Sequence, residues 1–162
     1  MSRQLARRGA LGAALLIAPL LLPNRAATAQ VPHPLVGRWS VEYERGRRIE
    51  NGEATPIMGT GRFTIEPRGD SLVAVFEAGQ RPDGTVPPPV TLTAPATAPE
   101  VTFTQQQLAT ITINGVQQER RITLTWTLTA SGDTLGGTLR RELPALPEPL
   151  PPTPVTGTRL RG

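Results

Sequence analysis

The chain has no cysteine, a single histidine and only three aspartates in 162 residues. The absence of cysteine excludes disulfides, thiol nucleophiles and a lipid anchor attached to an N-terminal cysteine. The histidine, His33, lies between two prolines, in a segment that supplies no nucleophile for it to activate. Each aspartate adjoins a glycine in an expected turn, which is not the clustered arrangement that metal sites use (Asp70, Asp83, Asp133). The sequence therefore predicts no catalytic residues, no metal site and no cofactor, and we expect a protein that is not an enzyme.

Paired carboxylates are the remaining route to acid–base chemistry. Glu42 and Glu44 lie two residues apart in an expected strand, on the face opposite Trp39, Val41 and Tyr43. Charged residues that alternate with apolar ones are typical of a solvated strand face. We therefore predict that both glutamates face solvent, as do Arg120 and Arg140 by the same parity argument.

Residues 1–29 have the layout of a secretory signal peptide. They combine a basic head, an apolar run at 10–22 that Pro19 interrupts, and the small-x-small cleavage site Ala27-Thr28-Ala29. The apolar run is too short to span a hydrocarbon core of ~30 Å. We expect an exported protein, periplasmic or extracellular, that begins near Gln30 and has no membrane anchor. The pair Arg7-Arg8 leaves the twin-arginine export route open beside the general one.

The positive charge of the chain belongs to this segment. Of the 17 basic and 13 acidic residues, four arginines and no acidic residue lie within residues 1–29, which leaves 13 of each sign in the rest. Nucleic-acid binding depends on a surplus of positive charge. The remaining chain has no such surplus, so we expect no nucleic-acid partner. Every basic residue is an arginine, which we interpret as the codon bias of a GC-rich genome.

The clearest structural signal lies at residues 120–141. Apolar residues alternate with threonine in the first half, and leucine or glycine alternates with polar residues in the second. Such alternation predicts two strands with one buried face, and the Ser131-Gly132-Asp133 segment between them predicts a hairpin turn. In either turn register the same buried face carries six residues, which are Leu124, Trp126, Leu128, Leu135, Gly137 and Leu139.

Similar short strands are predicted along residues 35–162, after an extended lead-in at 30–34. We expect them at 35–44, 58–66, 72–78, 90–93, 100–104, 108–113 and 155–161, with loops at 46–56 and 79–99. The Asn114-Gly115 pair predicts a further hairpin, in which Ile113 pairs with Val116. The fold class predicted is all-β, a single antiparallel up-and-down barrel of about eight strands whose last strand closes against the first. A β-sandwich is the alternative.

The motifs of this barrel resemble a known group. The segment Leu35-Val36-Gly37-Arg38-Trp39 is similar to the Gly-x-Trp start of lipocalin-type barrels, and the Gly-Asp hairpins and the closing Gly157-Thr158-Arg159 resemble small exported bacterial lipocalin-like domains. The resemblance implies that Trp39 packs at the closed end of the barrel under Arg159, both in structural roles. It also implies a small apolar ligand inside the barrel. The Thr-Asp-Tyr motif of classical lipocalins is absent.

Two functions from different classes follow. In the first, the barrel binds a small apolar ligand, with a wall formed by Phe63, Phe76, Leu124, Trp126 and Leu139. In the second, it is a structural or protein-interaction module at the cell envelope. Its protein partner would meet the strand 72–78, which is apolar on both faces, or the proline-rich loop 79–99.

Overall fold

The computed structural model describes residues 32–50, 53–97, 99–113, 116–143 and 150–161. The predicted signal peptide and the Asn114-Gly115 turn lie outside these residues. The described residues form eight strands and no helix. The strands are β1 (Gly37–Glu50), β2 (Glu53–Arg68), β3 (Ser71–Ala78), β4 (Val90–Pro95), β5 (Glu100–Ile113), β6 (Val116–Ser131), β7 (Thr134–Glu142) and β8 (Thr153–Arg159).

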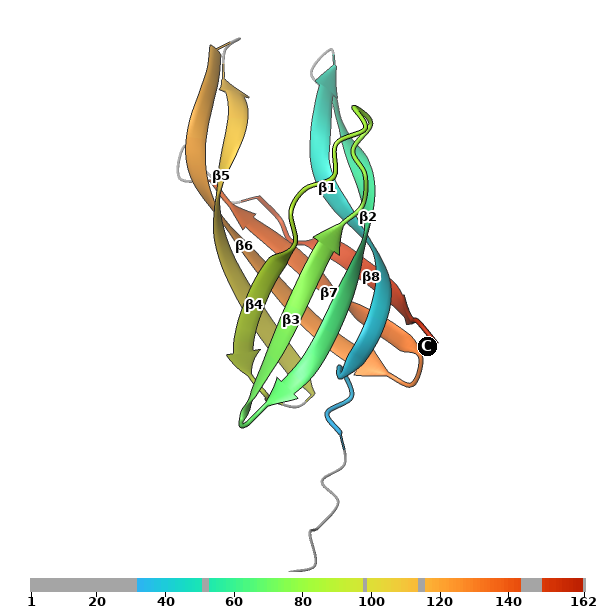
Figure 1. The fold of residues 1–162 in the computed structure, drawn as a ribbon. Helices are drawn as coiled ribbons and strands as arrows, with labels where there is room; N and C mark the ends of the chain where they lie inside the picture. The colour runs from blue at the N-terminus through green and yellow to red at the C-terminus, as the bar shows by residue number, and fades with distance from the viewer. Residues whose placement is uncertain (1–31, 51–52, 98, 114–115, 144–149, 162) are drawn as a thin grey trace, which may run out of the picture. The chain divides into compact units, whose positions relative to one another are not determined.

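All eight strands belong to one antiparallel sheet, in the order β4-β3-β2-β1-β8-β7-β6-β5. The last strand pairs with the first, as predicted, with Trp39 opposite Arg159 and Tyr43 opposite Val155. The two edge strands of the sheet, β4 and β5, lie against each other without a hydrogen-bonded ladder. The sheet is therefore a nearly closed up-and-down barrel (Figure 1), and the sandwich alternative is wrong.

The central hairpin has the predicted register. Its turn is Gly132-Asp133, because Ser131 pairs with Thr134 and Trp126 pairs with Leu139. Gly132 has a φ of 58°, a left-handed backbone that glycine adopts at little steric cost. The inward residues of the hairpin are buried, and Trp126 is only 1% exposed. The alternating pattern identified this face correctly because each outward threonine remains in water and each inward leucine leaves it.

Two hairpins are longer than predicted. The charged segment 46–56, expected to be a loop, instead continues β1 to Glu50 and begins β2 at Glu53. The predicted strands 100–104 and 108–113 are one strand, β5, which runs through three glutamines without a break. Both hairpins project beyond the rest of the barrel (Figure 1). Residues 46–56 and the three glutamines 105–107 lack the apolar alternation of buried strands, so the pattern did not identify these parts of the two hairpins.

One end of the barrel is closed by an arginine stacked on a tryptophan. The Arg159 guanidinium carbon lies 4.1 Å from the centre of the Trp39 ring, and Trp39 is completely buried. The indole nitrogen of Trp39 donates a hydrogen bond of 2.8 Å to the Leu35 carbonyl, so its one polar group is satisfied. We call this the closed end, and it has the packing that the resemblance implied for Trp39 and Arg159.

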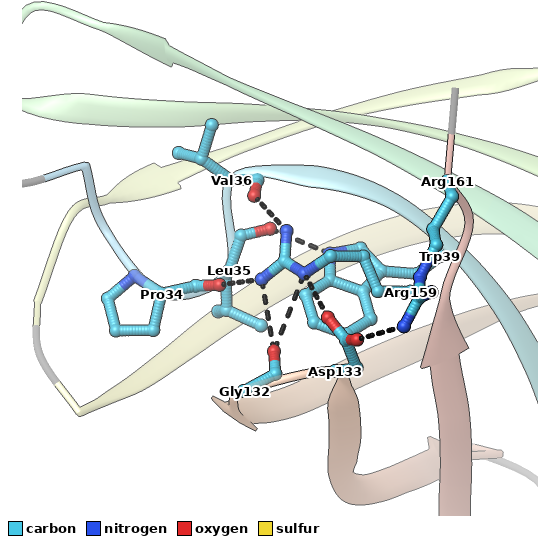
Figure 2. A network of polar contacts seen from close by, with 8 residues as sticks. All are labelled: Pro34, Leu35, Val36, Trp39, Gly132, Asp133, Arg159 and Arg161. Carbon is cyan, nitrogen blue, oxygen red and sulfur yellow. Dashed lines mark hydrogen bonds and ion pairs between the residues drawn. The ribbon is translucent and has the colours of Figure 1, made fainter.

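The same guanidinium ties two other segments to β8 (Figure 2). It donates to the carbonyls of Pro34 at 2.9 Å and Val36 at 2.7 Å, both in the lead-in before β1. It also donates to the Gly132 carbonyl and lies 3.4 Å from a carboxylate oxygen of Asp133, in the β6–β7 turn. A planar five-donor fork suits this task because it can stack on the ring and donate in its own plane.

The packing of Arg159 explains why the Gly-x-Trp motif has a glycine at position 37. A Cβ on Gly37 would lie 2.4 Å from an Arg159 guanidinium nitrogen, and Gly37 has a φ of 136°. Any other residue would both strain the backbone and displace the arginine. The lead-in before it is also ordered, since the Leu35 amide donates to His33 Nδ1 at 3.2 Å. His33 is half-buried in this turn. A linker residue would be expected to be fully exposed.

We expect Trp126→Ala to lower the free energy of unfolding by about 3–5 kcal/mol, as large-to-small changes at buried aromatic positions do. Urea unfolding would measure the loss. Leu108→Ala, at a β5 residue that is 66% exposed, is the control and should change stability by less than about 0.5 kcal/mol. A loss below that value for Trp126→Ala would contradict the packing of the central hairpin.

The closed end gives a second prediction, based on a substitution that preserves the charge of Arg159. Arg159→Lys should destabilise the barrel by about 1–2 kcal/mol, because an ammonium neither stacks on Trp39 nor serves several carbonyls at once. Arg161→Lys is the matched control, since the Arg161 side chain is 89% exposed, and it should be near neutral. Equal stability of the two variants would show that the stack contributes little.

Candidate functional site: the cavity at the open end

The barrel contains a cavity of about 870 Å³ at the end opposite Trp39. Along β1, Trp39 belongs to the closed end, whereas the segment from Tyr43 to Gly46 lines the cavity. The other walls come from β2, β3, the segment 79–90, β5, β6, β7 and residues 150–153. We call this the open end, and we call its partly or fully exposed rim residues Arg45, Arg81, Pro88 and Gln107 the mouth.

The floor of the cavity is part of a layer of four aromatic side chains. Trp126 makes ring contacts with Tyr43 at 5.3 Å, Phe63 at 5.4 Å and Phe76 at 4.9 Å between centroids. The contacts of Trp126 with Tyr43 and Phe63 are edge-on, with interplanar angles of 68° and 85°, a geometry that aromatic quadrupoles favour. All four rings are at least 92% buried. We call this set the aromatic layer, and it separates the packed half of the barrel from the hollow half.

Four of the five residues predicted for a ligand wall line this cavity, namely Phe76, Leu124, Trp126 and Leu139. The fifth, Phe63, is fully buried in the aromatic layer and packs against Phe76 at 4.7 Å between centroids. It supports the floor without lining the cavity. The prediction placed these residues on one inward face, but it could not tell how far along the barrel axis the packed region extends.

The prediction that Glu44 faces solvent is wrong. Glu42 is exposed as expected, whereas Glu44 is only 8% exposed and lines the cavity. Directly after Glu44 the register of β1 shifts, because Glu44 pairs with Met58 and Gly46 pairs with Ile57, so that Arg45 is an extra residue. A β-bulge of this kind bends the strand and redirects the side chains beside it, so simple alternation does not hold there. The other two residues of that prediction, Arg120 and Arg140, are exposed.

Arg141 is an inward residue that the sequence reasoning missed. It follows Leu139 by two positions and so shares the inward face of β7. Its guanidinium donates to the Glu44 backbone carbonyl on β1, on the other side of β8, and lies 3.4 Å from the Thr153 hydroxyl. The parity signal was present at Leu135, Gly137 and Leu139, and extending it by one step would have found Arg141. The cavity is therefore less purely apolar than the leucine and tryptophan pattern predicted.

Two more arginines, Arg45 and Arg81, stand at the mouth. Arg45 is the bulged residue of β1 and its side chain lies over Gly59, whose missing Cβ leaves room for it. Arg81 follows β3 and is exposed. Both also border a smaller recess of about 390 Å³, beside Ile57 and Asp83. Asp83 accepts hydrogen bonds from the Thr85 amide and hydroxyl at 2.9 and 2.7 Å. These bonds hold its pKa below the ordinary value, with a smaller contribution from Arg81.

Tyr43 lies where the apolar floor meets these cations. Burial raises the pKa of its phenol above the ordinary value of 10.0, and the positive charges of Arg45, Arg141 and Arg81 oppose this rise. Three guanidinium groups are thus close enough to Tyr43 to act on it. Glu44 is the one acidic residue among the described residues that line the cavity.

The described residues contain no group of three or more His, Cys, Asp or Glu side chains placed to hold a metal ion. They also contain no helix with the length and apolar character needed to cross a membrane. In comparisons with known proteins, no protein-family model, no curated protein and no solved structure matches this chain.

The second predicted surface, the strand 72–78, is β3. Its inward residues Leu72, Ala74 and Phe76 are buried, and its outward residues Val73 and Val75 are half-buried. In the outer face they lie beside polar neighbours on both sides, since Val75 pairs with Thr64 and Thr91. An interaction surface on this strand stays a prediction.

We predict that the barrel loses stability above about pH 10 through Tyr43. The folded-state pKa is raised, so the unfolded chain releases the phenolic proton first, and stability present below the unfolded pKa is lost as pH rises. Tyr43 is the only tyrosine and the chain has no lysine or cysteine, so phenolate absorbance and alkaline urea unfolding both report on it cleanly. Tyr43→Phe should remove most of this pH dependence, and a phenol that titrates below its ordinary value would contradict its burial.

Proposed function

We propose that this protein is a non-catalytic barrel that holds a small apolar ligand in the cavity at its open end. The observation that supports the proposal is a cavity of about 870 Å³ with an aromatic floor, within the ~300–1,000 Å³ range of small-molecule sites. Leu124, Leu139 and Ile122 extend the apolar lining beyond Phe76 and Trp126. Apolar surface in an open cavity favours an apolar occupant, because water gains by leaving it.

We further propose a lipocalin-like kinship. It is supported by an eight-stranded, nearly closed up-and-down barrel whose Gly-x-Trp segment packs under a late arginine at the closed end. The cavity lies at the other end. The proposal agrees with ligand binding but does not identify the ligand.

We propose that the protein works outside the cytoplasm, in the periplasm or the medium, without a membrane anchor or a nucleic-acid partner. The support is the signal-like sequence of residues 1–29 and the balanced charge of the rest.

Tryptophan emission offers the test, since Trp126 lies in the cavity floor. Long-chain fatty acids and aromatic dyes should quench or shift the emission saturably, with dissociation constants of about micromolar size. Ala109→Phe adds a ring to the cavity wall on β5 and should weaken binding about tenfold or more by occupying ligand volume. Thr104→Phe places the same ring on the exposed face of the same strand and should leave binding unchanged.

If a ligand bound the Ala109→Phe variant as tightly as the Thr104→Phe variant, its site would lie elsewhere on the protein. No saturable response from any ligand in the panel would overturn the proposal.

A further inference from the structure

The mouth of the cavity carries positive charge above an apolar floor. Arg45 and Arg81 both line the cavity and the adjoining recess. Among the described residues, no ion pair is formed by either guanidinium. The Asp83 carboxylate accepts hydrogen bonds from Thr85, and Glu44 is buried, with the Arg141 guanidinium donating to its backbone carbonyl. The two outer arginines are therefore the groups of this cavity that remain to receive a negative charge.

The backbone around these two arginines places both of them at the mouth. The β1 bulge places Arg45 at the rim, and Gly59 on the paired strand provides the space that its side chain crosses. The proline-rich segment after β3 carries Arg81 to the same rim, where Pro87 and Pro88 also line the cavity. Arg45 and Arg81 line the same cavity as Tyr43, and their positive charges oppose the rise in the pKa of its phenol.

We propose that the ligand is a single-chain amphiphile with an anionic oxygen head group, carboxylate or phosphate. Its chain would lie on Phe76, Trp126 and Leu124, and its head would bind Arg45 and Arg81 at the mouth. Guanidinium forks match both head groups in geometry and are less strongly hydrated than ammonium groups. An uncharged amphiphile would gain only the apolar contacts between its chain and the cavity floor. A cationic head group would be repelled by the two arginines. This inference rests on the proposed function, because it assigns the head group of the same ligand.

Chain-matched probes separate the contribution of the head from that of the chain. Dodecanoate, dodecyl phosphate, dodecanol and dodecyltrimethylammonium would be titrated calorimetrically into the full-length protein, below their micelle-forming concentrations. We expect the two anions to bind about tenfold or more tightly than dodecanol, and the cation to bind most weakly. The advantage of the anions should shrink at high salt, because exposed charges are screened. The stronger of the two anions would assign the head group.

Charge-neutral variants test the residues. Arg45→Gln and Arg81→Gln should each weaken dodecanoate binding roughly fivefold, the size that mostly exposed ion pairs reach, and the double variant should bind dodecanoate no better than dodecanol. Arg62→Gln is the control, since Arg62 lies on the exposed face of β2, 3.8 Å from Glu77, and binding should not change.

The outcomes distinguish this inference from the proposed function. Equal affinity of the unchanged protein for dodecanol and dodecanoate would overturn the anionic head group and leave the apolar site standing. A preference for the anions that survives in the double variant would overturn the assignment to Arg45 and Arg81. Failure of every chain to bind would overturn both.

Discussion

The stack of Arg159 on Trp39 fixes the end of the barrel from which the rest is organised. The pairing of β8 with β1 joins the last strand to the first and places these two residues directly opposite each other. The guanidinium then joins the lead-in and the β6–β7 turn to the same point through the Val36 and Gly132 carbonyls. Gly37 must also be small for the arginine to approach. Arg159 therefore constrains three parts of the sequence, which are the lead-in, Gly37 and the β6–β7 turn.

A closed end and an open end follow from how side-chain volume is distributed along the barrel. From the closed end to the aromatic layer the inward residues are large, as at Trp39, Phe103 and Leu128, all fully or almost fully buried. Beyond the layer several inward positions hold small residues, as at Gly59, Ala78 and Ala109, which line the cavity. An eight-stranded barrel is just wide enough for large side chains to fill. Replacing them with glycine and alanine on neighbouring strands therefore leaves space rather than a tighter core.

The sequence predicted the closed half of the barrel better than the open half, for a physical reason. Alternation identifies a face wherever burial selects leucine, valine or tryptophan, and the order and pairing of β6, β7 and β8 follow from it. At the open end the inward positions include Gln105, Gln107 and Arg141, which border the cavity and so need not be apolar. Hydrophobic periodicity disappears there although the strands continue, which is why 46–56 was predicted to be a loop.

The bulge at Arg45 explains why the polar part of the site was hidden as well. Up to Tyr43 the parity of β1 is regular, and the register then shifts by one extra residue, at a point where Glu44 is buried and Arg45 lies at the rim. A prediction from strict alternation assigns the whole strand one inside–outside frame. It therefore cannot show a register shift within the strand. Gly46 is the local signal, since glycine within a strand often accompanies a bulge. The residues that would decide ligand chemistry thus depend on a local irregularity, whereas those that hold the barrel together depend on its regularity.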